Sequence, residues 1–304
     1  MEDVVVIGGG AAGLNAALVL ARARRRVLVI DAGEPRNAPA RGVHGFISRD
    51  GTPPAELLAV GRAEVESYGG RVVAGRAEQA GTADGGFEIT LQDGSVRARR
   101  LIIATGLRDE LPDVPGLRDR WGRDVLHCPY CHGWEVRDLP IGVLGWQPLA
   151  VHQASLVRQW SDDVVLFDSG AMLDEQDRAT LAARSVRIVE GKVVGLVVED
   201  DKLRGVRMVD GTVVSRSALF VPPNFIPIDG LLAGLGCERD DEGMIKVDDT
   251  GRTSVAGVWA VGNVVDRAAF VVAAAAAGAR AAAAVNMDLV EQEVGAASAG
   301  APRR

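Results

Sequence analysis

Several residue types that mark common protein classes are scarce in this sequence of 304 residues. Three cysteines are too few for the disulfide framework of a small secreted domain. A basic excess is missing, because 34 lysines and arginines face 41 aspartates and glutamates, so we expect no nucleic-acid partner. The alanine-rich stretch at 273–285 is interrupted by Gly278 and Arg280, so we expect no membrane anchor. The composition predicts a cytoplasmic α/β protein.

The N-terminal residues show the pattern of a dinucleotide-binding motif. An apolar strand at 4–7 leads into glycines with G-x-G-x-x-G spacing, namely Gly8, Gly10 and Gly13. A helical stretch follows, and then a second apolar strand that ends at Asp31. The glycines permit a tight turn, a close approach of pyrophosphate and close packing of helix on strand, while Asp31 can accept ribose hydroxyls. We therefore interpret this apolar start as a cofactor site and not as a signal peptide.

Two of the three cysteines lie close together in the segment HCPYCHGWEV at 127–136. A zinc site needs four ligands, but Cys237 is remote, and His127 and His132 lie too close to the cysteines for a relaxed tetrahedron. A structural disulfide that closes so short a loop would add little to the stability of the fold. Redox chemistry remains as the better interpretation of Cys128 and Cys131, because a C-x-x-C motif stabilises a thiolate. We predict no metal site.

Two later motifs distinguish FAD from NAD as the first cofactor. LIIATG at 101–106 is an apolar strand that runs into a turn of small residues, and VAGVWAVGNVVD at 255–266 is a similar strand before the alanine-rich helix. With the glycine motif and the cysteine pair, these segments resemble the low-molecular-weight thioredoxin reductases. The resemblance covers nearly the whole chain. It implies bound FAD and a homodimer.

The fold class implied is α/β, with two Rossmann-like, three-layer domains. The FAD domain is expected to be discontinuous, at 1–113 and 241–304, with an NAD(P)-like domain inserted at 114–240. Within the insertion, residues 193–223 are typical of a β-meander with an Asp-Gly hairpin turn. Residues 292–304 are expected to be a disordered tail.

The resemblance also assigns roles to residues. Cys131 would exchange electrons with the flavin, and Cys128 would exchange with the external thiol or disulfide. His132 replaces the aspartate usual in the family and could transfer protons, or it could be only a polar residue at a helix end. Asn263 also replaces an aspartate, but its amide can still hydrogen-bond a ribityl hydroxyl. The cofactor-binding residues expected are Gly8, Gly10, Ala12, Gly13, Asp31, Asn37, His44, Thr105, Gly106, Gly262 and Asn263.

The second nucleotide motif, in the insertion, is damaged. If Gly145 is its first glycine, Gln147 occupies the position where a pyrophosphate must approach, next to the bulky Trp146. The next strand is followed by an acidic segment, which would repel a 2′-phosphate: Asp168, Asp174, Glu175 and Asp177. NAD(P)H binding is therefore doubtful. This combination resembles the dithiol oxidases that close disulfides in gliotoxin and holomycin.

Three functions remain open on these grounds. The favoured one is an FAD-dependent oxidation of a small-molecule dithiol to a disulfide, with O2 as the acceptor. The alternative is an NAD(P)H-dependent reductase of thioredoxin or of another small disulfide protein, because the cysteine pair serves either direction. A non-catalytic flavin redox sensor is the third. Cys237 is interpreted as a buried apolar residue.

Overall fold

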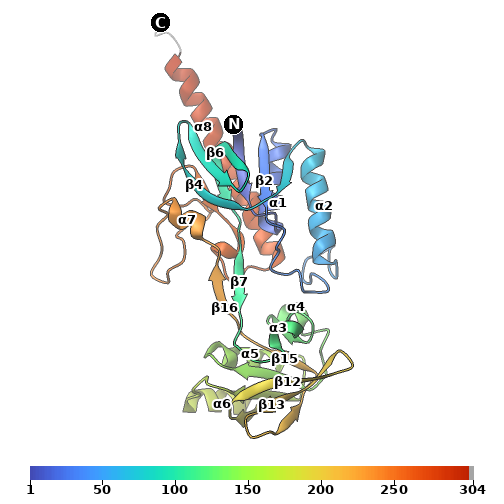
Figure 1. Cartoon of the computed structure of the whole chain (residues 1–304). Coiled ribbons are helices and arrows are strands. Elements are labelled where there is room, and N and C mark those ends of the chain that lie inside the picture. The colour runs from blue at the N-terminus through green and yellow to red at the C-terminus, as the bar shows by residue number, and fades with distance from the viewer. Residues whose placement is uncertain (301–304) are drawn as a thin grey trace. The chain divides into compact units, whose positions relative to one another are not determined.

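The computed structural model describes residues 1–300, and the chain forms two compact units (Figure 1). Unit 1 contains Met1–Ala38, Pro54–Arg108 and the C-terminal segment from Ile226, while unit 2 contains Pro39–Pro53 and Asp109–Phe225. The inserted unit therefore begins earlier than the predicted residue 114 and ends before 240. It ends early because Leu232 and Cys237 are buried in the core of unit 1.

Unit 1 contains a seven-stranded sheet in which β3-β2-β1-β6-β5-β4 are neighbours and β17 also pairs with β6. The strands are β1 (Glu2–Ile7), β2 (Val27–Asp31), β3 (Arg71–Ala74), β4 (Ala77–Ala83), β5 (Gly86–Leu91), β6 (Gly94–Ile103) and β17 (Val258–Ala260). β1, β2, β3, β17 and the second half of β6 run parallel, and β4, β5 and the first half of β6 form an antiparallel meander. Val4–Ile7 of β1 and Val27–Ile30 of β2 are continuous apolar runs because both faces of these strands are buried.

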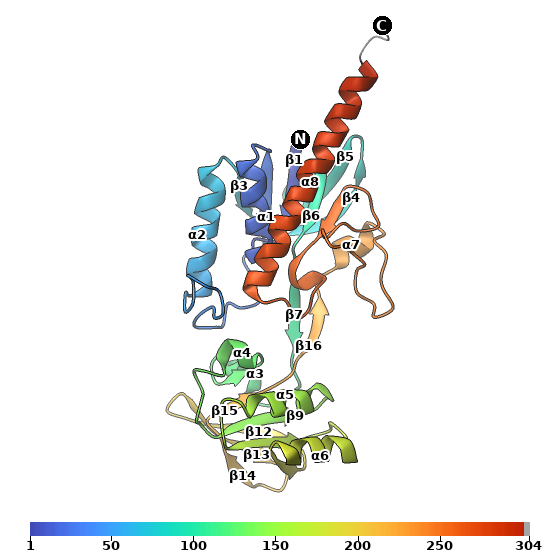
Figure 2. The same cartoon turned by 180° about the vertical axis from the view of Figure 1, so that it is seen from behind.

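Helices α1 (Ala11–Arg22) and α8 (Val271–Gly300) pack side by side in unit 1 (Figure 2). Their close approach requires Gly278, since a Cβ at this position would lie 2.0 Å from the Ala12 carbonyl oxygen. Two further helices belong to this unit, α2 (Pro54–Ser67) and α7 (Gly230–Gly234), together with the 3₁₀ helix η1 (Gly262–Val264). Trp259, Leu20 and Val285 are among the side chains buried between sheet and helices.

The expectation of a disordered tail from residue 292 is wrong for residues 292–300, which continue α8. This segment is rich in alanine, the strongest helix former. Its Glu293 also accepts hydrogen bonds from Arg25 at 2.6 Å and from Arg99 at 2.8 Å, which attach the helix to the sheet side of unit 1. The remaining four residues of the predicted tail lie outside the described residues.

Unit 2 contains a five-stranded parallel sheet in the order β11-β10-β9-β15-β8. Its strands are β8 (Val125–Leu126), β9 (Ile141–Gly145), β10 (Val164–Asp168), β11 (Arg187–Glu190) and β15 (Ala218–Phe220). The helices of this unit are α3 (Leu117–Arg120), α4 (Pro129–His132), α5 (Leu149–Val157) and α6 (Glu175–Ala183). The parallel strands of both sheets, with their helices, confirm the predicted α/β class with two dinucleotide-type folds.

The predicted meander is present as β12 (Val193–Glu199), β13 (Lys202–Met208) and β14 (Val213–Ser215), which pair antiparallel in that order. Gly211 sits at the expected Asp-Gly turn with φ of 87°, a conformation that favours glycine. Strands β7 (Leu107–Glu110) and β16 (Asn224–Pro227) pair where the chain crosses between the units.

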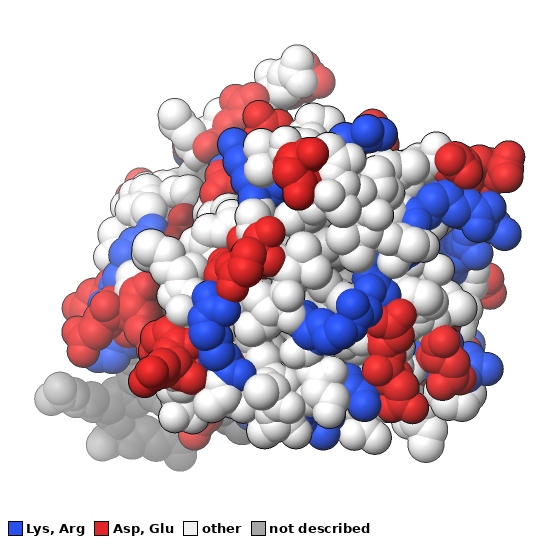
Figure 3. All heavy atoms as spheres, turned by 90° about the horizontal axis from the view of Figure 1, so that it is seen from below, with Lys and Arg blue, Asp and Glu red and all other residues white. Residues whose placement is uncertain are grey.

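The surface charge is mixed on the face drawn in Figure 3, where acidic and basic side chains alternate without a broad basic area. This pattern agrees with the formal net charge of −7. Among residues 1–300, no helix combines the length and apolar character needed to span a bilayer.

Candidate functional site

Most of the predicted cofactor residues come together at one edge of the unit 1 sheet. The parallel strands β1, β2, β6 and β17 all end there, and backbone hydrogen bonds continue beyond the strand ends, from Ala104 N–H to Ile7 and from Val261 N–H to Ile103. The carboxyl edge of a parallel sheet is where such folds bind ligands. The glycine turn, Asp31, the Thr105 turn and the Gly262 turn are therefore neighbours.

The glycine turn forms a cradle that leaves the start of α1 open. Gly8 has φ of 110°, and a Cβ there would lie 2.3 Å from the Ala104 carbonyl oxygen. A Cβ at Gly13 would lie 1.9 Å from the Gly8 carbonyl oxygen, so helix and strand touch at this point. Gly10 is the N-cap of α1 without a side-chain hydrogen bond, and a Cβ there would meet nothing within 4 Å. The open space and free N–H groups suit a pyrophosphate.

Asp31, at the end of β2, is already held in its charged form. Its Oδ1 accepts hydrogen bonds from Gly9 N–H at 3.1 Å and Gly33 N–H at 3.2 Å, and its Oδ2 accepts one from Arg62 at 2.7 Å. Burial alone would raise the pKa of Asp31, but the Arg62 and backbone hydrogen bonds outweigh it and lower the pKa. Oδ2 keeps a lone pair, so the carboxylate can accept one ribose hydroxyl beside Arg62.

The two later turns lie at the same edge. The Thr105 hydroxyl donates to the Ile228 carbonyl oxygen at 2.6 Å, and Gly106 has φ of 73°. Gly262 has φ of 75°, and a Cβ there would lie 3.0 Å from the Ala12 Cβ, which brings η1 against the first turn of α1. Close approaches explain the glycines of the first turn and Gly262, while the positive φ of Gly106 favours glycine in the Thr105 turn.

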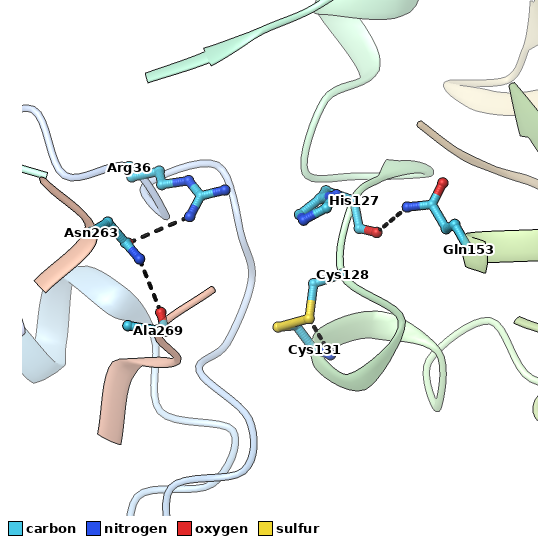
Figure 4. Close-up of a disulfide and its surroundings, with 7 residues drawn as sticks. All are labelled: Arg36, His127, Cys128, Cys131, Gln153, Asn263 and Ala269. Atoms are coloured by element: carbon cyan, nitrogen blue, oxygen red, sulfur yellow. Dashed lines mark hydrogen bonds between the residues drawn. A yellow bond between two sulfur atoms is a disulfide. The ribbon is translucent and has the colours of Figure 1, made fainter. Parts of the chain in front are cut away.

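Asn263 is fixed by its own turn (Figure 4). Its amide nitrogen donates to the carbonyl oxygens of Asp266 at 2.9 Å and Ala269 at 3.1 Å, so both of its N–H groups are used. Its Oδ1 accepts a hydrogen bond from Arg36 at 3.4 Å. A ribityl hydroxyl could therefore reach Asn263 only as a donor to Oδ1.

Two predicted cofactor residues lie elsewhere. Asn37 is half-buried in the turn after β2 in unit 1, and its contact with a cofactor stays a prediction. His44 belongs to unit 2, in the loop 39–53. Its Nδ1 is 3.4 Å from Asp50 Oδ2, and its Nε2 is 3.5 Å from Glu135 Oε1.

The cysteine pair forms a disulfide at the start of α4, directly after β8 (Figure 4). Cys128 is the N-cap of this helix, with Pro129 at the first helical position, where proline is preferred. The Cys131 N–H donates to Cys128 Sγ at 3.1 Å. This hydrogen bond would stabilise negative charge on the Cys128 sulfur after reduction. The bond joins residues of a single turn and connects no separate elements, so it is no structural staple.

The strand that leads into the cysteine pair is anchored by a residue that the sequence did not reveal. Gln153 on α5 is buried, with 4% of its surface exposed, and its Nε2 donates to the His127 carbonyl oxygen at 2.6 Å (Figure 4). Because His127 directly precedes Cys128, this hydrogen bond fixes the backbone at the first cysteine. On the other side, Gly133 packs against Trp160, since a Cβ there would lie 2.7 Å from the indole ring.

His132 follows Cys131 and is the last residue of α4. Burial is the largest influence on the pKa of His132 and lowers it, and the charge of His44 lowers it further. Glu135 raises it, but the net direction is downward. The ring is therefore held neutral near neutral pH, which is the form that accepts a proton. The role of His132 as a proton carrier stays a prediction.

The damaged nucleotide motif of unit 2 is filled by its own side chains. The strand order of the sheet reverses between β9 and β15. Dinucleotide folds bind their ligand at such a switch point, at the carboxyl edge of the sheet. Here Trp146 Nε1 and Gln147 Nε2 both donate to the Pro222 carbonyl oxygen at 2.7 Å. The two side chains thus occupy the turn after β9, and the loss of NAD(P)H binding stays a prediction.

The acidic segment after β10 has a structural explanation. Asp174 is the N-cap of α6 and forms a capping box with Asp177, in which each side chain accepts a hydrogen bond from the backbone N–H of the other. Asp168 lies 3.6 Å from Arg178, which also pairs with Glu190. The segment therefore caps a helix with acids where a 2′-phosphate site would have cations.

The remaining cysteine, Cys237, lies in the core of unit 1 with 8% of its surface exposed, as predicted. Burial raises the pKa of its thiol, and the hydrogen bond with Thr253 only partly opposes this. In the described part of the chain, no three His, Cys, Asp or Glu side chains are grouped as metal ligands would be.

A dinucleotide cradle in one unit and a redox-capable cysteine pair in a second dinucleotide-type unit define a flavoprotein disulfide oxidoreductase. Residues 2–278 match the family described as pyridine nucleotide-disulphide oxidoreductase, and the chain belongs to this family. It is an oxidoreductase of the thioredoxin reductase type.

Individual relatives support this assignment. Thioredoxin reductase tcpT of Claviceps purpurea (strain 20.1) is 33% identical over 279 residues, which is 86% of each chain. Thioredoxin reductase sirT of Leptosphaeria maculans is 30% identical over 281 residues, again 86% of each. The crystal structure of HlmI is 56% identical, with a TM-score of 0.95 over 98% of this chain and 95% of that one. The recognised family and subgroup are thereby confirmed.

The family is FAD-dependent, and the residues of unit 1 fit this cofactor. The open N-cap at Gly10 and the α1 N–H groups would hold the pyrophosphate, Asp31 the ribose, and Asn263 Oδ1 a hydroxyl of the linker. Arg62 orients Asp31 and Arg36 orients Asn263. Neither arginine was predicted, because these pairings depend on tertiary contacts.

Proposed function

We propose that this protein oxidises a small-molecule dithiol to a disulfide, with O2 as the final electron acceptor. The observation that carries this proposal is the double hydrogen bond of Trp146 and Gln147 to Pro222, which occupies the nucleotide entrance of unit 2. Without NAD(P)H as electron donor, the cysteine pair has to receive its electrons from the substrate. The direction of flow is then from thiol to disulfide.

The exchange steps follow from the chemistry of the cysteine pair. A substrate thiolate attacks Cys128 Sγ, the bond to Cys131 breaks, and Cys131 leaves as a thiolate. The second substrate thiolate then attacks the substrate sulfur of this mixed disulfide, and Cys128 leaves with its charge stabilised by the Cys131 N–H. His132 accepts a thiol proton, because its lowered pKa keeps the ring neutral.

Bound FAD would take up the two electrons of the reduced cysteine pair and deliver them to O2, forming hydrogen peroxide. The protein itself holds this cofactor at the cradle of unit 1 and keeps the cysteines in a reactive turn. Gln153 serves the second task by fixing the backbone before Cys128. As in the family, we expect a homodimer, and a cytoplasmic location also stays a prediction.

An anaerobic titration of the flavin absorbance tests the proposal. NADPH and NADH are added first, and a small dithiol such as dithiothreitol second. We expect bleaching only by the dithiol, with recovery and hydrogen peroxide formation when air is admitted. Bleaching by NADPH would overturn the proposed direction, and a colourless purified protein would overturn the flavin assignment.

An NAD(P)H-dependent disulfide reductase is the second candidate, because the relatives tcpT and sirT are named thioredoxin reductases. The cysteine pair can serve this direction without change, since thiol–disulfide exchange is reversible. The same titration separates the two candidates, because a reductase requires that NADPH or NADH reduce the flavin before any dithiol is added.

A further inference from the structure

The peptide groups on both sides of Cys128 are held by hydrogen bonds. The carbonyl oxygen before it, that of His127, accepts the Nε2–H of Gln153 at 2.6 Å (Figure 4). The carbonyl oxygen of Cys128 itself accepts the N–H groups of Cys131 at 3.2 Å and His132 at 3.1 Å. The backbone torsions of Cys128 are therefore fixed from both sides, by α5 and by α4.

Gln153 is a polar residue on an otherwise apolar, buried face of α5, beside Ala150, Ala154 and Val157. Its Oε1 is buried without a hydrogen-bond partner among residues 1–300. Since such an acceptor costs stability, an apolar side chain would suit this position better if packing were the only requirement. The His127 carbonyl can only accept, so the atom of Gln153 that faces it is the amide nitrogen. This hydrogen bond is therefore what Gln153 contributes.

The oxidised and reduced forms of the cysteine pair depend on this hydrogen bond to different extents. In the oxidised form the covalent bond to Cys131 holds the Cys128 sulfur in the turn. Reduction removes that bond, and the backbone at Cys128 then has to keep the sulfur beside the Cys131 N–H, which donates to it at 3.1 Å. Because this N–H stabilises a thiolate, a contact that fixes the backbone contributes more to the reduced form.

We propose that Gln153 is a positioning residue that raises the reduction potential of the Cys128–Cys131 pair through the His127 carbonyl. A stabilised Cys128 thiolate favours the reduced form and makes the disulfide a stronger oxidant of thiols. Gln153 acts through the backbone and is not a catalytic residue. The inference rests on the redox role proposed for the cysteine pair, and it applies to either direction of electron flow.

The test compares the wild-type holoenzyme with Gln153→Met, which keeps the length of the side chain but has no N–H donor. Ser155→Ala is the matched control, because its hydroxyl donates at 2.9 Å to the Val151 carbonyl oxygen within α5 itself. The proteins are equilibrated anaerobically at pH 7 with mixtures of reduced and oxidised dithiothreitol. Reduced dithiothreitol gives the cysteine pair two electrons and two protons as it closes its own disulfide. Acid quenching, alkylation and mass spectrometry then give the fraction of protein with the Cys128–Cys131 disulfide.

We expect Gln153→Met to need a ratio of reduced to oxidised dithiothreitol about tenfold higher for half reduction, which is about 30 mV in potential. This shift corresponds to the loss of about one pKa unit of thiolate stabilisation. Ser155→Ala is expected to match the wild type. If Gln153→Met does not fold, Gln153→Glu keeps the shape of the side chain, its ionised carboxylate cannot donate, and the same shift is expected.

An unchanged ratio in the Gln153 variant, even with a lower free energy of unfolding, would mean that Gln153 only packs, and it would overturn the proposal. An equal shift in Ser155→Ala would overturn it as well, because any disturbance of α5 would then have the same effect. If dithiothreitol does not reduce the cysteine pair even in the wild type, the redox role of the pair is wrong, which is a different result from an unchanged ratio.

Discussion

The side chain of Gln147 donates a hydrogen bond to the carbonyl oxygen of Pro222, and Trp146 donates a second to the same atom. One backbone oxygen thus holds two bulky residues in the turn after β9. In a nucleotide-binding turn, this position needs glycine so that phosphates can approach the backbone. Side chains therefore fill this turn, which supports the proposal that unit 2 serves as a scaffold for the cysteine turn.

This shared acceptor predicts non-additive effects on stability. Trp146→Phe and Gln147→Met each remove one donor but keep most of the side-chain volume, and the Pro222 oxygen retains the other donor. In the double variant the oxygen of the buried Pro222 loses both donors, which costs about 1–3 kcal/mol. We expect the free energy of unfolding to fall in the double variant by more than the sum of the single losses. Urea denaturation of the four proteins measures this, and additive losses would contradict the shared-acceptor interpretation.

Local spacing made much of the site predictable. The functions expected of Gly8, Gly10 and Gly13 depend on positions within one turn. The family resemblance, and not local spacing, indicated Thr105 and Gly262, and the parallel strands bring them to the same edge. Local spacing likewise placed Trp146 and Gln147 in the turn after β9.

Contacts between remote segments could not be predicted. The loop of His44 groups with unit 2, where the ring meets Glu135, and contact of His44 with the cofactor stays a prediction. Gln153 appears in the sequence as an ordinary helix residue, and only the fold places its amide at the His127 carbonyl. The prediction of a disordered tail failed for another reason. Glu293 forms ion pairs with Arg25 and Arg99 that hold this end of α8, and a local sequence pattern does not contain such contacts.

Two glycine substitutions separate cofactor binding from folding. Gly13→Ala places a Cβ 1.9 Å from the Gly8 oxygen, so we expect helix and strand to separate and stability to fall by several kcal/mol. Gly10→Ala meets no protein atom within 4 Å and keeps φ at −78°, so we expect a loss of about 1 kcal/mol or less. Its FAD content should nevertheless fall, because the Cβ projects where a pyrophosphate would lie. Thermal unfolding and flavin absorbance measure both, and a Gly10→Ala protein with full FAD occupancy would argue against this cradle.

The two cysteines should differ in reactivity once they are separated by mutation. In Cys131→Ser, the backbone N–H of residue 131 still reaches Cys128 Sγ, so this thiolate stays stabilised. In Cys128→Ser, the remaining sulfur of Cys131 lacks that donor. We expect iodoacetamide at pH 7 to alkylate Cys131→Ser faster, by about tenfold for each 1.4 kcal/mol of thiolate stabilisation. Mass spectrometry of the labelled protein, with Cys237→Ser added to both as background, gives the two rates, and the reverse order would exchange the roles assigned to the cysteines.

The pH dependence of dithiol oxidation should follow the protonation state of His132. Burial, followed by the charge of His44, lowers the pKa of His132 below its ordinary value of about 6.5. The neutral ring therefore accepts protons throughout the neutral range, and the acid limb of the rate should have its midpoint below pH 6.5. His132→Asn should lower the rate at pH 7 by about 10²- to 10⁴-fold.

The same shift has a consequence for stability with a definite sign. His132 binds its proton more weakly in the folded protein than in the unfolded chain. Its contribution to the free energy of unfolding is therefore complete above the unfolded pKa of about 6.5 and is lost as pH falls toward the lower folded pKa. His132→Asn should remove this component, so the stability difference between the wild type and the variant should shift in favour of the variant between pH 7 and pH 5. Urea denaturation at both pH values measures the difference, with His152→Gln as the control for an exposed histidine. A difference that does not change with pH would show that His132 is not buried as described.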